Sequence, residues 1–121
     1  MGLTNHQEAM TMLTRKTPDT LSTALTITGQ GVPDIKFNVT YHNRKQSDLE
    51  ELLAKHQASD EAKRDPQYAN RQCLLYIIRD WETEYPPTDE GIKEMEDDRP
   101  GMIELLFIGY HMARRVQAGK N

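Results

Sequence analysis

The chain has 121 residues, with 15 Lys and Arg against 19 Asp and Glu, so its formal net charge is −4. This length suits one hydrophobic core rather than two, and we expect a single domain over 1–121. The acidic balance argues against nucleic acid as the main ligand, because neutralising phosphates needs a surplus of Lys and Arg. With an apolar fraction of only 36%, the places where apolar residues concentrate must form the core and any partner surface.

The cysteine content and the hydropathy also narrow the class of protein. Cys73 is the single cysteine, so no internal disulfide forms, and we expect a buried thiol in a reducing compartment. No apolar stretch approaches the roughly 18 residues of a membrane span, and the N-terminal residues lack the apolar core of a signal peptide. We therefore expect a soluble, cytoplasmic protein that has no membrane partner.

The first expected elements are a short helix and a β-hairpin. Asn5 and Glu8 fit a capping box for a helix over 3–16. Apolar and polar residues then alternate along 21–28 and again along 35–42, on either side of a Gly-, Pro- and Asp-containing turn. This period of two predicts a β-hairpin over about 20–42, within a hairpin region at 18–43, with one face buried.

Helical periodicity dominates the remainder, the helical region at 47–118. The whole chain is therefore expected to adopt an α+β fold, in which three to four helices pack on the apolar face of the hairpin. The expected segments are a helix over 47–56 opened by a Ser47–Glu50 capping box, a polar link over 57–65, a helix over 66–81 with Pro66 in its first turn, a short helix capped by Thr88, and a last helix over about 101–117 with Pro100 at its start.

Two of these helices carry more apolar surface than one face can hold. The six-residue run at 73–78 covers the whole circumference of the central helix. In the last helix, Phe107, Ile103 and Ile108 extend an already broad apolar face on both sides. The residues expected on that broad face are Met102, Leu105, Leu106, Gly109, Met112, Ala113 and Val116. Both helices are either simple core helices, or their excess apolar surface meets a partner or a second copy of the chain.

Trp81 and the uneven charge each have a local explanation and a functional one. Trp81, the only tryptophan, is expected at the end of the central helix, as a lid on the core or as a partner anchor. Acidic residues gather in 89–98 and basic residues in 111–121. Both groups suit the helix dipoles, and the basic group is too small to form a nucleic-acid platform.

Nothing in the sequence assembles a catalytic centre. His6, His42, His56 and His111 fall in different expected elements, without the spacing of a metal site. The chain has no G-x-S-x-G, P-loop or G-x-G-x-x-G motif. We therefore expect a protein that is not an enzyme, with no catalytic residue, bound metal or cofactor.

The order of landmarks in the C-terminal half resembles a known family. Ile78-Arg79-Asp80-Trp81 is followed by Pro86-Pro87, a Thr-capped short helix at 88–92, an acidic stretch with Pro100, and a final helix containing Ile103, Tyr110 and Ala113 that closes on Gly119-Lys120-Asn121. This arrangement, behind a hairpin, is similar to the tail assembly chaperones of long-tailed bacteriophages. The likeness is best over about 74–121 and looser over 20–56.

The resemblance implies a non-enzymatic assembly factor. Members of this family coat the long tape measure protein in the host cytoplasm before the tail tube polymerises, and they are absent from the mature virion. Expected partners are therefore the tape measure protein, the tail tube protein and further copies of the chain. The residues predicted to bind a partner are Trp81, Ile103, Phe107, Tyr110 and Arg114. The alternatives are a structural head–tail or tail-tube subunit, or a small regulatory or nucleic-acid-binding protein.

Overall fold

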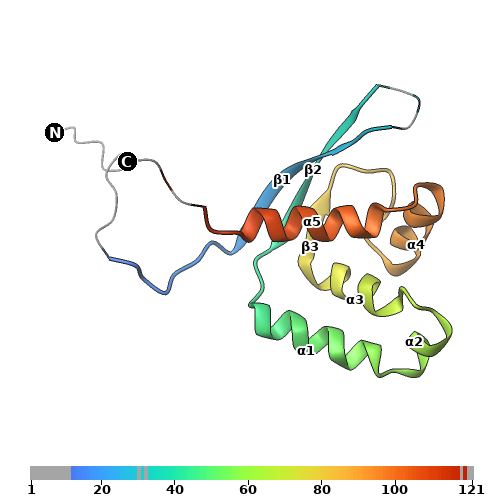
Figure 1. The fold of residues 1–121 in the computed structure, drawn as a ribbon, viewed down its shortest axis with the longest axis horizontal. Helices are drawn as coiled ribbons and strands as arrows, with labels where there is room; N and C mark the ends of the chain where they lie inside the picture. Colours follow the sequence, from blue (N-terminus) through green and yellow to red (C-terminus); the bar gives the residue numbers. More distant parts are fainter. Residues whose placement is uncertain (1–11, 30, 32, 118, 120–121) are drawn as a thin grey trace.

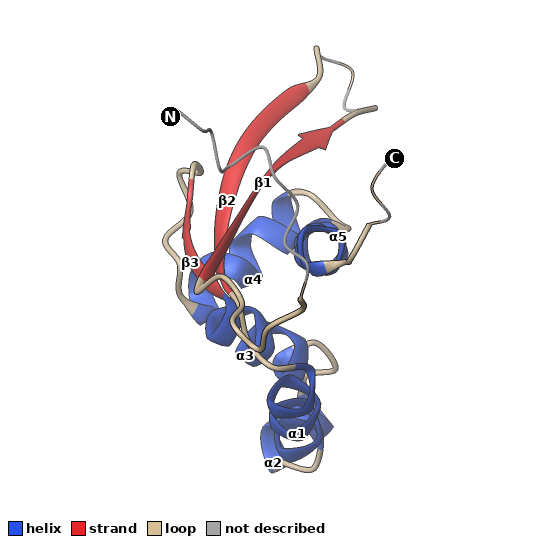
Figure 2. Ribbon diagram, turned by 90° about the vertical axis from the view of Figure 1, so that its left-hand side faces the viewer, coloured by secondary structure: helices blue, strands red, loops and turns tan. Residues whose placement is uncertain are grey.

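Three antiparallel strands, in the order β1–β2–β3, form the sheet of this computed structural model (Figures 1 and 2). The structure describes residues 12–29, 31, 33–117 and 119. β1 (Thr20–Ile27) pairs with β2 (Ile35–His42) over their full length. The predicted hairpin is therefore confirmed, as is the α+β class. The end of the hairpin that carries the connecting turn projects beyond the helices (Figure 1).

The alternation along the hairpin separates a buried face from an exposed one. Leu25 of β1 and Phe37, Val39 and Tyr41 of β2 are buried, because their side chains all point to the side of the sheet covered by helices. The polar residues between them face the other way, where Ser22 Oγ lies 3.2 Å from Thr40 Oγ1 across the two strands. The hairpin thus supplies half of a hydrophobic core that the helices complete.

Five helices lie within the described residues, and two of them cover the sheet. α3 (Tyr68–Ile77) and α5 (Met102–Arg114) pack against the buried face, and α1 (Gln46–Gln57) packs on α3 (Figure 2). α2 (Asp60–Arg64) is a short helix capped by Ser59, where the sequence predicts a polar link. α4 (Asp89–Asp98) contacts both α3 and α5.

The predicted helix over 66–81 is wrong in its last four residues. α3 ends at Ile77, and the chain continues as a third strand, β3 (Ile78–Trp81), paired with β2. The bond from the Glu82 N–H to the Asn38 carbonyl extends this pairing. The strand forms because β2 offers an unpaired edge there, and this long-range contact outweighs the local helical pattern. Trp81 accordingly lies on a strand and not at a helix end.

Several helix boundaries also differ from those expected. α1 has Lys45 at its N-cap and no side-chain capping bond, so the predicted Ser47 cap does not form. Pro66 lies in the turn before α3 rather than in its first turn. The Thr88 cap of α4 is confirmed by a 3.0 Å bond from the Gly91 N–H to its hydroxyl.

The predicted helices nearest the two ends of the chain also differ from the structure. Of the predicted N-terminal helix over 3–16, residues 3–11, including its Asn5–Glu8 capping box, lie outside the described residues, and residues 12–16 are not helical. α5 spans Met102–Arg114, shorter than the predicted 101–117. Its N-cap is Gly101 with φ 104°, a conformation that favours glycine. The carboxylate of Glu96 in α4 accepts bonds from the Gly101 and Ile103 N–H groups and so caps α5 from outside.

Candidate functional site

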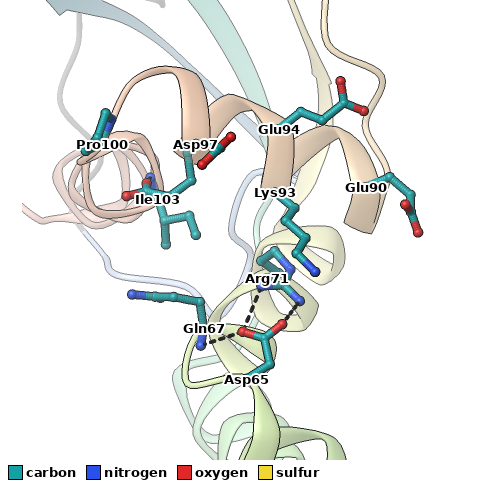
Figure 3. A pocket seen from close by; sticks show the side chains of 10 residues that line it. Asp65, Gln67, Arg71, Glu90, Lys93, Glu94, Asp97, Pro100 and Ile103 are labelled. Carbon is teal, nitrogen blue, oxygen red and sulfur yellow. Dashed lines mark hydrogen bonds and ion pairs between the residues drawn. The ribbon is translucent and has the colours of Figure 1, made fainter.

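A cleft of about 570 Å³ lies between α3 and α4 (Figure 3). Its centre is Arg71, whose side chain is almost completely buried. The guanidinium donates two bonds to the Asp65 carboxylate, at 2.6 and 3.3 Å, and one to Asp89 at 2.9 Å. The remaining lining residues are Gln67, Glu90, Lys93, Glu94, Glu96, Asp97, Pro100 and Ile103.

These contacts indicate a structural role for the cleft. The Arg71 guanidinium bonds to Asp65 and holds the pKa of that carboxyl below its usual range. Because its Nε and both terminal nitrogens are already engaged by carboxylates, Arg71 is not free to bind an anionic ligand. The ten lining residues, all of which the structure describes, include no Ser, Thr, Cys or His. Arg71 therefore joins α3 to the first residue of α4 and to the segment before α3.

A second, more apolar hollow lies between α1, α3 and α5, and we name it the α1–α5 groove. It encloses about 200 Å³ and is lined by Gln46, Leu49, Glu50, Leu53, Asn70, Cys73, Phe107 and His111. Cys73 is buried, and its burial raises the pKa of the thiol, so it lines the groove as a small apolar group. Phe107 is half-buried and stacks on the His111 ring with centroids 6.5 Å apart.

The outer side of α5 adds exposed apolar surface beside this groove. The exposed helical residues fall on one side of α5, which we name the α5 stripe: Glu104, Ile108, His111, Met112 and Arg115 at the C-cap. Ile108 is 45% exposed and Met112 65% exposed. With Val116, they are three of the five large apolar residues exposed in the described part of the chain. Ile108 and Met112 lie on α5 and Val116 lies just beyond its C-cap, so this side of α5 is a candidate interaction surface.

The broad apolar face predicted for the last helix divides between core and surface. Met112 and Val116 are exposed, whereas Ile103 and Tyr110 face the core. The physical reason is the close approach of Gly109 to the sheet, which turns that side of α5 toward β1 and β2. A Cβ on Gly109 would lie 2.6 Å from Leu25 Cδ2 and 2.8 Å from the Tyr41 hydroxyl.

The structure divides the five predicted partner-binding residues between core and surface. Ile103 is 5% exposed and Tyr110 fully buried, so both belong to the core and offer a partner no accessible surface. Trp81 is half-buried, and its indole N–H donates to the Tyr85 carbonyl at 2.9 Å. Arg114 donates from Nε to Asn43 at 2.8 Å. Of the five, only Phe107 lies on the α1–α5 groove.

Sequence reasoning placed His111 on a polar strip of the last helix with Glu104 and Arg115. It did not single out Leu53 or Met112 as surface residues. Helical spacing places Leu53 on the inward apolar stripe of its helix. It places Met112 on the broad apolar face of the last helix, which suits either a core or an interface. Whether Met112 lies in the core or on the surface is decided by how α5 packs across the sheet. That packing depends on segments that are distant in the sequence. Ile108, at the margin of the predicted face, was the one available hint.

Comparisons with known proteins assign no function to the chain. No protein-family model, no curated protein and no solved structure matches the chain. Among the described residues, no helix is both long and apolar enough to cross a bilayer. The same part of the chain contains no group of three or more His, Cys, Asp or Glu side chains that could hold a metal ion.

Proposed function

We propose that this protein is a non-enzymatic tail assembly chaperone of a long-tailed bacteriophage, which binds the tape measure protein and keeps it soluble in the host cytoplasm. The observation that carries the proposal is the α1–α5 groove, an apolar hollow on the surface of an acidic chain. The family resemblance of residues 74–121 supplies the identity of the client. The finished virion is not expected to contain the protein.

The landmarks behind the resemblance have structural roles here. Trp81 is tied to the Tyr85 carbonyl, and Thr88 caps α4. Pro86 lies so close to Gly91 that a Cβ there would overlap its carbonyl oxygen. These contacts shape the connection from β3 to α4. The resemblance therefore supports a shared arrangement of the chain, and the binding role is argued from the groove itself.

The groove suits an amphipathic helix. Leu49 and Leu53 are four residues apart on α1 and face Phe107 of α5 across Cys73, so the hollow has apolar walls and an apolar floor. A large apolar side chain from a client helix would be held there by burial of its surface, and Glu50 and Gln46 at the rim would bond its polar flanks. This mode of binding needs no cofactor and no chemical step.

The decisive experiment is co-expression of the tape measure protein with the full chain. We expect the wild type to keep the client soluble and to co-purify with it. Leu53→Gln should lower the co-purified amount about tenfold, because it places a polar group in an apolar wall at a cost of about 1–2 kcal/mol.

The chain offers a matched control for this experiment. Leu52 is half-buried on the same helix but faces Tyr76 on another side, so Leu52→Gln should retain capture. A client that stays insoluble with the wild type, or equal loss in both variants at equal stability, would overturn the proposal.

A structural virion subunit is the second candidate, and the outer edge of the sheet favours it. β1 is an edge strand of eight residues, Thr20–Ile27, without a charged side chain. Exposed edges without charges are prone to pair with another strand. Mass spectrometry of purified virions separates the two candidates, since only a structural subunit would be present in stoichiometric amounts.

A further inference from the structure

We infer that the α5 stripe is a self-association surface, on which two copies of the chain pack their α5 helices antiparallel about a two-fold axis. The inference does not depend on the identity of the client, because it concerns a different side of α5 from the groove wall formed by Phe107. It rests on the spacing of the exposed residues, on their charges and on the absence of intramolecular partners for those charges.

The spacing of the stripe is that of a helix-pairing seam. Glu104, Ile108, His111 and Arg115 are separated by four, three and four residues, which is the repeat that keeps one line of side chains facing a neighbouring helix. Met112 flanks the line at its centre. All five are exposed, and the residues between them are buried or half-buried. The stripe is thus a narrow line with Ile108, His111 and Met112 at its centre and a charge at each end.

The order of the charges selects the partner and its direction. In an antiparallel pair, Glu104 of one copy lies beside Arg115 of the partner subunit, and the same contact forms at the other end. In this register Ile108 faces the partner subunit's His111 near the axis, and Met112 of each copy flanks this central pair. A parallel pair would instead bring like charges together at both ends, which is unfavourable. The stripe is therefore complementary to itself in one direction only.

The charged groups are available for this contact. Within the described residues, the Glu104 carboxylate and the Arg115 guanidinium have no hydrogen bond or ion pair. Arg114, by contrast, is held by Asn43 and lies over the Tyr110 ring. The two neighbouring arginines thus differ: Arg114 fastens the end of α5 to the hairpin, and Arg115 is left to an outside partner.

The size of the stripe predicts a weak dimer. A helix of 13 residues is about 20 Å long, so one α5–α5 contact buries less than the roughly 1,200 Å² at the low end of stable complexes. We therefore expect a reversible equilibrium with a Kd in the range of about 10–100 µM, dimeric when copies are crowded together.

Sedimentation velocity of the full chain, from about 5 to about 500 µM, tests this inference. The wild type should shift from monomer to dimer. Glu104→Arg and Arg115→Glu should each raise the Kd at least about tenfold, because each turns two attractive pairs into repulsive ones. The double variant, and an equimolar mixture of the two single variants, should dimerise like the wild type.

An apolar substitution and a control complete the test. Replacing both Ile108 and Met112 with Gln should abolish the dimer, whereas Leu13→Gln, at a residue 96% exposed outside the stripe, should leave it unchanged. A wild type that stays monomeric throughout, or a dimer indifferent to charge reversal, would overturn the inference. Monomeric protein whose stripe variants lose the tape measure protein would overturn it too, and would make the stripe part of the client site.

Discussion

Gly91 lies in the first turn of α4, directly against the Pro86 carbonyl. A Cβ at this position would overlap the Pro86 oxygen and would lie 2.9 Å from the carbonyl carbon and 3.0 Å from Pro86 Cγ. That carbonyl accepts a bond from the Thr88 N–H at 2.8 Å, and Gly91 in turn donates to the Thr88 hydroxyl. These hydrogen bonds hold the backbone on both sides of the overlap, so neither segment can move away without weakening one of them.

The substitution Gly91→Ala sets two effects of opposite sign against each other. Inside an ordinary helix, alanine is more favourable than glycine by about 0.5–1 kcal/mol. Here the overlap adds about 1–3 kcal/mol of overpacking and disrupts hydrogen bonds worth about 1 kcal/mol each. We expect a net loss of about 2–3 kcal/mol, equivalent to a fall in Tm of about 10 °C.

Urea denaturation followed by far-UV circular dichroism measures this loss, with an unchanged m-value as the sign of a simple change in stability. Glu90→Ala, at the exposed neighbouring position, is the matched control and should change stability by less than about 0.5 kcal/mol. A Gly91→Ala variant as stable as the wild type would refute the close packing of the Pro86 carbonyl on α4.

Three further substitutions test other contacts of the fold. Arg71→Ala should cost about 2–4 kcal/mol in urea denaturation, since it leaves Asp65 and Asp89 without their buried partner. Because Arg71 lowers the pKa of Asp65, the variant should also show a smaller fall in stability than the wild type as the pH drops below about 4. Thr88→Ala removes the α4 cap and should lower the free energy of unfolding by about 1 kcal/mol, and a loss under 0.3 kcal/mol would contradict that role. Burial raises the pKa of Tyr41 well above its usual value of about 10, so the folded state keeps this proton at a pH where the unfolded chain loses it; stability should fall above about pH 10 by up to about 1.4 kcal/mol per pH unit, and Tyr41→Phe should reduce that slope in a pH series.

Local patterns in the sequence predict the hairpin and the α4 cap well. The alternation along β1 and β2 depends on side chains only two residues apart, and Thr88 acts within its own helical turn. Such local signals do not depend on the conformation of the rest of the chain. β3 is different, because Ile78–Trp81 continues an apolar run that suits a helix equally well. Its strand conformation depends on β2, about 40 residues earlier in the sequence.

The surface could be predicted only in outline for the same reason. The composition and the helical wheel indicate that α5 has more apolar surface than a core needs, and Ile108 and Met112 are indeed exposed. Which side faces the sheet is decided by Gly109, where the lack of a side chain lets α5 approach Leu25 and Tyr41. Ile103 and Tyr110 were assigned to a partner surface because this approach cannot be read from one helix alone.

The placement of the few apolar residues links the fold to the proposed function. Most large apolar side chains meet in one core between the sheet, α3 and α5. Exposed apolar side chains of the described helices are concentrated on the α1–α5 groove and the α5 stripe. The two surfaces adjoin at His111, so self-association and client binding are expected to influence each other.

Hydrogen exchange of the full chain with and without the tape measure protein tests the central claim most directly. If the α1–α5 groove holds the client, protection should increase in α1 and α5, and Leu53→Gln should abolish the increase while Leu52→Gln retains it. Protection confined to β1, or no change anywhere on addition of the client, would contradict the assignment of the groove as the binding site.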